Sequence, residues 1–251
     1  MQNSKPVTAV GLNGDMTKQS KLAGNRVMTL WRTVIGKKLV MAATGVVLIA
    51  FLFGHMMGNL KMFSGPEEIN AYARFLRNAG LPELGHGQLL WMVRIVLLVC
   101  VTLHITAAVQ LTRMSHAARP VGYNVKRNIE TTFATRMMRW GGVLLAAFVV
   151  FHLLHLTGGL VGFKAGQFQH LAVYQNVVAA FHVWPVAIFY IVAMATLCLH
   201  LGHGIWSLLQ TLGWSTVRNE AMLKLVSWII AIVMFVGFSS IPIAVMVGWL
   251  H

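Results

Sequence analysis

The sequence predicts an all-α membrane protein with five transmembrane helices, and three observations lead to this fold class. Only 10% of the 251 residues are charged, whereas 57% are hydrophobic, and the mean hydropathy is +0.69. A soluble domain carries about 25% charged residues, so this chain could not cover a water-facing surface. Five stretches are long and apolar enough to cross a bilayer core, which takes about 20 residues of helix.

Each apolar stretch is expected to be a helix, because backbone groups inside a membrane must find their hydrogen-bond partners within the segment. Residues 1–35 are polar and lack the apolar core of a signal peptide. We therefore expect a cytoplasmic N-terminal segment over residues 1–35 and one membrane domain over residues 36–251. The five spans are predicted at Leu39–Met62, Leu89–Leu111, Gly141–Phe163, Val186–Leu209 and Ala221–Leu250.

Lysine and arginine are distributed unevenly between the two sides, which predicts the orientation of the chain. The N-terminal segment and the loops after the second and fourth spans carry fifteen of them, and the other side carries four. The N-terminus is therefore predicted to be cytoplasmic and the C-terminus external, which accounts for the net charge of +14 without a nucleic acid partner. The loop after the first span, with a short amphipathic helix over Glu67–Arg77, is expected to be the only sizeable structure outside the membrane.

Six of the eleven histidines lie within the predicted spans, where ionisable groups are costly and usually functional. His55 and His152 lie toward the outer side of the membrane, and His104 and His200 toward the inner side. At a rise of 1.5 Å per residue the two levels differ by about 10 Å. The sequence thus predicts two bis-histidine sites on the first four helices. The other two histidines, each three residues after a predicted ligand and able to replace it, are His155 and His203.

Two opposed imidazoles in an apolar shell are typical of a low-spin b-type haem. The spans contain no Asp or Glu, which excludes a carboxylate di-metal site, and a closed zinc site would need four ligands at one depth. No Cys-x-x-Cys-His motif is present for covalent haem attachment. Two glycines lie close to His55 and two close to His200, where they would allow a flat macrocycle to approach or serve helix packing. They are Gly54, Gly58, Gly202 and Gly204.

Two other interpretations remain open from the residues alone. Cys100 and Cys198, with His104 and His200, could hold a Rieske-type iron–sulfur cluster at the inner level. Against this, Cys198 lies about 200° around the helix from His200, and buried cysteine is usually a small hydrophobic residue. A haem-free transporter could instead use the intramembrane histidines as a proton path.

Several separated segments occur in an order that resembles a known family. The sequence is similar over residues 28–250 to the single-chain cytochrome b subunit that anchors succinate:quinone oxidoreductase, the respiratory complex II, including fumarate reductases. The segments that carry the resemblance are Ile35–Gly45, Gly54–Leu60, Asn70–Leu76, Leu103–Ile105, Ala118–Tyr123, Phe151–Leu156 and Leu199–Ser207. The haem ligands of that family fall on the first four helices, at positions that match His55, His104, His152 and His200.

The resemblance implies a multi-pass protein of the bacterial cytoplasmic membrane that has no succinate site of its own. It implies two non-covalent b haems, a flavoprotein subunit and an iron–sulfur subunit as partners, and a membrane quinone, menaquinone by preference, as electron acceptor. Electrons would reach the inner haem first and the outer haem second, and a trimer of the whole complex is compatible with the family. Arg94 is the candidate partner for the propionates of the outer haem, with Arg139 and Arg32 for the inner one.

A diheme subunit of another quinone-linked enzyme, such as a formate dehydrogenase or a hydrogenase, is the nearest alternative to this assignment. The segments Gly54–Leu60 and Asn70–Leu76 favour the complex II anchor over that alternative. The sequence does not distinguish succinate oxidation from fumarate reduction as the physiological direction.

Overall fold

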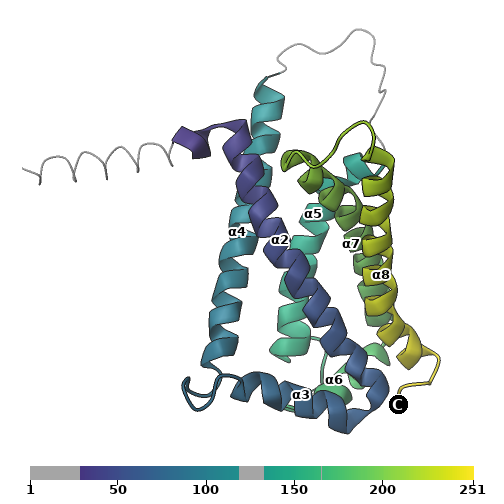
Figure 1. Cartoon of the computed structure of the whole chain (residues 1–251). Helices are drawn as coiled ribbons and strands as arrows, with labels where there is room; N and C mark the ends of the chain where they lie inside the picture. Colours follow the sequence, from purple (N-terminus) through teal and green to yellow (C-terminus); the bar gives the residue numbers. More distant parts are fainter. Residues whose placement is uncertain (1–28, 119–132, 165) are drawn as a thin grey trace, which may run out of the picture.

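The computed structural model describes residues 29–118, 133–164 and 166–251, and in these residues the chain is all α-helical. Five helices are long and apolar enough to cross a membrane, as the sequence predicts. They are α2 (Val34–Asn59), α4 (Gln88–Ala117), α5 (Phe133–His152), α7 (Trp184–Thr211) and α8 (Glu220–Met246) (Figure 1). The all-α class and the five spans are therefore confirmed for the described part of the chain.

The long helices run side by side and alternate in direction, so that α2 begins at one end of the bundle and the C-terminus lies at the other (Figure 1). Two shorter helices, α3 (Pro66–Asn78) and α6 (Val173–Phe181), lie across the end near the C-terminus. We call this the capped end; it is the end that the charge distribution predicts to be external. Helix α3 confirms the amphipathic helix expected over Glu67–Arg77.

Two predicted spans are too long at their C-terminal ends, and glycine explains both differences. Helix α5 continues through one π-helical turn, η2 (Leu153–Thr157), and stops there rather than at Phe163. Gly159 and Gly162 follow at φ +62° and +78°, a left-handed conformation that ends helices. In the same way α8 ends at Met246 rather than Leu250, since Gly248 has φ +77°.

The prediction that the loop after the first span is the only sizeable structure outside the membrane was wrong. Helix α6 lies in the connection between α5 and α7 and packs against α3. The amide of Asn70 in α3 joins the two helices, donating to Gln175 Oε1 at 3.2 Å and accepting from the backbone N–H of Tyr174 at 3.1 Å. Helix α6 escaped detection because its nine residues are mostly apolar and merge with the hydrophobic run that follows.

The long helices pack unequally against one another. Helix α7 packs closely on α8 and on α5, while α4 packs closely on α2. Of the residues of α4, all of which the structure describes, Ala107 alone is buried, and Leu98 is 67% exposed. Such apolar exposure is expected for a helix that faces lipid, whose tails are as apolar as leucine.

Candidate functional site

The structure brings the predicted histidines together as two pairs, each joining two different helices. His55 on α2 faces His152 on α5, with 6.0 Å between the ring centroids. His104 on α4 faces His200 on α7, with ring centroids 6.4 Å apart. These are the two pairs that depth alone predicts. We call them the outer pair (His55 and His152) and the inner pair (His104 and His200).

The two pairs lie at different levels along the bundle. His55 and His152 are each about one turn from the point where their helical segments end at the capped end. His104 and His200 are each about four turns from the capped ends of α4 and α7. The pairs therefore stack along the bundle axis, one near the capped end and one deeper.

Each pair bridges two helices whose backbones do not pack closely. Among the described helices, α4 is in close contact with α2 and α3, and the combinations α2 with α5 and α4 with α7 are not among the close packings. Imidazole side chains reach across the space that separates these backbones.

Hydrogen bonds orient one ring of each pair through its Nδ1 atom. His104 Nδ1 lies 3.2 Å from Thr44 Oγ1, and Thr44 in turn donates to the carbonyl of Val40 at 2.8 Å. Because that hydroxyl hydrogen is used, Thr44 is the acceptor and His104 the donor. His152 Nδ1 lies 3.3 Å from the hydroxyl oxygen of Tyr190. In both rings Nε2 is left free to bind another group. In histidine metal sites a hydrogen bond from Nδ1 fixes the ring in the same way, while Nε2 binds the metal.

The second ring of each pair has a different environment. His55 stacks on Phe51, with centroids 5.3 Å apart, and its Nε2 lies 3.5 Å from the amide nitrogen of Asn59. His200 has a buried Nδ1 atom without a hydrogen-bond partner. A buried polar atom that is left unpaired costs about 1–3 kcal/mol, so this nitrogen indicates a site at which the packing of the chain alone is incomplete.

The structure separates the predicted ligands from the two histidines that could replace them. His155 does not face His55; it is fully buried, and its Nδ1 lies 3.0 Å from the hydroxyl of Tyr190. His203 lies on α7 one turn beyond His200 and is not in ring contact with His104. His152 and His200 are thus the residues whose rings face the opposite helices.

The glycines near the ligands divide into two kinds. A Cβ atom at Gly202 would lie 2.7 Å from the indole of Trp228, and one at Gly58 would lie 2.6 Å from the ring of Tyr72. These two glycines serve helix packing. A Cβ at Gly54 or Gly204 would meet nothing within 4 Å, so close packing of the chain does not explain these two.

Sequence reasoning missed four residues that surround the pairs. Tyr190 and Thr44 hold ligand rings, as described above. Gly45 on α2 and Gly142 on α5 lie beside the inner pair: added Cβ atoms would be 3.7 Å from His104 Cε1 and 3.9 Å from His200 Cε1. Only Tyr190 carried a usable signal, because a tyrosine in the middle of an apolar span needs a polar partner for its hydroxyl.

The three arginine candidates lie at the ends of the bundle. Arg94 is exposed near the capped end of α4, with its guanidinium 5.0 Å from the ring centroid of Trp91. Arg139 Nη1 lies 2.8 Å from His116 Nε2 and so joins α5 to α4 at the opposite end. Arg32 is exposed just before α2. Their roles toward propionates stay predictions.

The four residues of the iron–sulfur alternative do not form a cluster. In the described part of the chain, which includes Cys100, Cys198 and the inner pair, no group of three or more His, Cys, Asp or Glu side chains could hold a metal ion. A Rieske-type centre needs two cysteines and two histidines together. The histidine rings are instead brought together in pairs.

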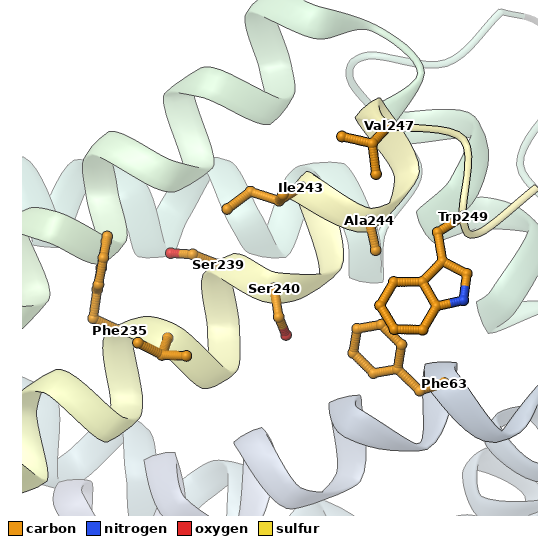
Figure 2. Close-up of a pocket in the computed structure, with 9 residues that line it drawn as sticks. Phe63, Phe235, Ser239, Ser240, Ile243, Ala244, Val247 and Trp249 are labelled. Atoms are coloured by element: carbon orange, nitrogen blue, oxygen red, sulfur yellow. The ribbon is translucent and has the colours of Figure 1, made fainter.

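A separate apolar groove of about 350 Å³ runs beside α8 at the capped end, where η1 (Leu60–Ser64) passes it. Figure 2 shows the rings of Phe63 and Trp249 next to each other at one end of the groove, with centroids 5.3 Å apart. Ser239 and Ser240 line its floor, and the buried Ser239 Oγ has no partner. None of the six membrane histidines lines this groove.

Seven of the fifteen basic residues behind the orientation prediction lie outside the described residues, among them Arg119, Lys126 and Arg127. The cytoplasmic position of the N-terminus therefore stays a prediction. No protein-family model, no curated protein and no solved structure matches this chain.

Proposed function

We propose that this chain is the diheme cytochrome b anchor of a bacterial succinate:quinone oxidoreductase. In this role it has no succinate site; it passes electrons from an iron–sulfur subunit through two b haems to a membrane quinone. The single observation that carries the diheme assignment is the pair of opposed imidazoles at each of two levels. The assignment to complex II, with its flavoprotein and iron–sulfur partners, depends on the sequence segments that resemble the family.

The separation of the rings supports bis-histidine ligation. A metal–imidazole bond of about 2.0 Å, with the nitrogen about 1.1 Å from its ring centre, puts the centres of two opposed imidazoles about 6 Å apart. The outer and inner pairs have centroid separations of 6.0 and 6.4 Å. The centroid separation of each pair is therefore compatible with one iron held between two imidazoles.

The surroundings of the pairs also fit a flat, apolar macrocycle. A Cβ atom at Gly54 or Gly204 would meet nothing within 4 Å, so a flat group could approach the backbone at these two positions. When bound, a b haem supplies a one-electron carrier whose potential depends on its axial ligands and its burial. The chain holds the two ligand pairs at different depths, and Thr44 and Tyr190 fix the orientation of one ring in each pair.

A reduced-minus-oxidised spectrum of the purified full chain tests the proposal. We expect b-type absorption with two haems per chain. A chain that is folded and expressed with haem supply but has no visible absorption would refute it and would favour the transporter interpretation.

The partner assignment has its own test. Affinity purification of the chain from its native membrane should yield a flavin-bearing subunit and an iron–sulfur subunit, and succinate should reduce the b haems in that preparation. Co-purification of a molybdenum- or nickel-containing partner instead would show a diheme subunit of another quinone-linked enzyme.

A further inference from the structure

We propose that Tyr190 is a positioning residue for the outer haem, and that its hydroxyl joins His152 to His155 in a hydrogen-bonded chain that lowers the haem's reduction potential. This inference rests on the proposed function, since it assumes that His152 is an axial ligand. It adds two residues, Tyr190 and His155, to the outer site and gives them a role that the ligand pair alone does not have.

The geometry of the three side chains is the basis of the proposal. The hydroxyl oxygen of Tyr190 lies 3.3 Å from His152 Nδ1 and 3.0 Å from His155 Nδ1. Tyr190 is 6% exposed and His155 is 0% exposed, so water does not compete for these contacts. The phenol ring packs against three aromatic neighbours, with Phe148 and Phe181 both at 5.0 Å and Phe151 at 6.1 Å between centroids.

Ligation determines which way the hydrogen bonds run. If iron takes His152 Nε2, the neutral ring keeps its hydrogen on Nδ1 and donates it to the tyrosine oxygen. The single hydrogen of that hydroxyl is then free to be donated to His155 Nδ1. His155 must in turn carry its own hydrogen on Nε2, which is a buried atom without a partner. The chain therefore runs from the ligand through Tyr190 to His155.

The backbone is irregular at the point where this arrangement needs it. In a regular α-helix, His155 would lie about 60° around the axis from His152. The π-helical turn Leu153–Thr157, marked by the bond from Gly158 N–H to the Leu153 carbonyl at 2.8 Å, changes that rotation. Such single π turns are frequent at functional sites. Here the turn lets both imidazoles reach one hydroxyl on the neighbouring helix α7.

The inner pair offers a matched comparison. His104 Nδ1 donates to Thr44, whose own hydrogen goes to the backbone carbonyl of Val40. The inner ligand thus has a hydroxyl acceptor but no second histidine behind it. A substitution at Tyr190 should act on the outer haem and one at Thr44 on the inner haem, although both remove a hydroxyl at a comparable distance from a ligand.

The direction of the effect follows from charge. A hydrogen bond from Nδ1–H to an acceptor makes the imidazole a stronger donor to iron, which favours the ferric state. Tyr190→Phe removes the acceptor while it keeps the ring and its packing. If the bond favours the ferric haem by about tenfold, its loss raises the midpoint potential of the outer haem by about 59 mV.

The experiment is a potentiometric titration of the full chain, followed by the b-haem absorption and by electron paramagnetic resonance of the ferric haems. In Tyr190→Phe we expect two haems, a raised potential and a shifted resonance for the outer haem, and no change at the inner haem. Thr44→Val should give the reverse pattern. His155→Phe should move the outer haem in the same direction by a smaller amount, because Tyr190 then remains as an acceptor but loses its own partner.

Each outcome has a defined meaning. Loss of the outer haem alone in Tyr190→Phe would also support the proposal, since the ligand ring would then need the bond to stay in place. Two haems with unchanged potentials in Tyr190→Phe, or equal shifts of both haems, would overturn it. If Tyr190→Phe does not accumulate, His155→Phe decides: an unchanged outer potential overturns the proposal. A wild-type chain without haem would instead refute the proposed function.

Discussion

Replacing each of the six membrane histidines singly by alanine should divide them into four that are required for haem and two that are not. Loss of either ring of the outer pair, His55 or His152, should remove one haem, and the same haem in both variants. Loss of either ring of the inner pair, His104 or His200, should remove the other. The reason is that each iron needs two imidazoles about 6 Å apart between centroids, and only these pairings have that separation in the structure.

In the four ligand variants, the expected haem content falls from two haems per chain to one haem per chain. His155→Ala and His203→Ala should keep two. For His155→Ala the structure also predicts a cost in stability, because a fully buried side chain and one of the two partners of Tyr190 are removed. That cost is about 2 kcal/mol, which corresponds to a fall in Tm of about 4–8 °C for a chain of this size.

The assay is the haem content of each purified variant by its pyridine haemochrome, together with the reduced-minus-oxidised spectrum, which distinguishes the two haems. His182→Ala is a suitable control, since this exposed histidine follows α6 and belongs to neither pair. If His155→Ala strips the outer haem while His152→Ala spares it, the ligand is His155 in η2 rather than His152 at the end of α5. If all four ligand variants keep both haems, the diheme assignment fails.

Three further predictions concern orientation, assembly and packing. A reporter fused after His251 should lie outside the membrane and one inserted near Lys126 in the cytoplasm; both on one side would contradict five spans. Four basic residues of the predicted cytoplasmic loop between the second and third spans, replaced together by alanine, should weaken retention of the soluble subunits, increasingly at high salt; they are Arg113, Arg119, Lys126 and Arg127. Unchanged retention would mean that these charges only orient the chain in the membrane. In the haem-free chain, Gly202→Ala should lower the Tm, because its Cβ would meet Trp228 at 2.7 Å and overpacking costs about 1–3 kcal/mol. Gly204→Ala should raise the Tm, because alanine favours a helix over glycine by about 1 kcal/mol. Equal Tm values for the two variants would refute the division of the glycines.

Local sequence properties were sufficient for the spans and for the level of each histidine. A span is recognised from a run of apolar residues, and the depth of a residue follows from its position in the run and the fixed rise of the helix. His55 and His152 could therefore be placed at one level, and His104 and His200 at another, without any tertiary contact. The ends of α5 and α8 were less well predicted, since apolar residues continue past the glycines that end both helices.

What the sequence by itself determined is thus the number of spans, their predicted orientation and the pairing of histidines by depth. Only the tertiary structure decided that the ring of His152, rather than that of the nearby His155, faces the opposite helix. It also decided that α6 packs beside α3 and that the Tyr190 hydroxyl lies between His152 and His155. The physical reason is that depth is a property of one helix along its axis, whereas the direction of a side chain around that axis depends on how helices pack. In α5 it depends further on a π turn that no hydrophobic pattern reveals.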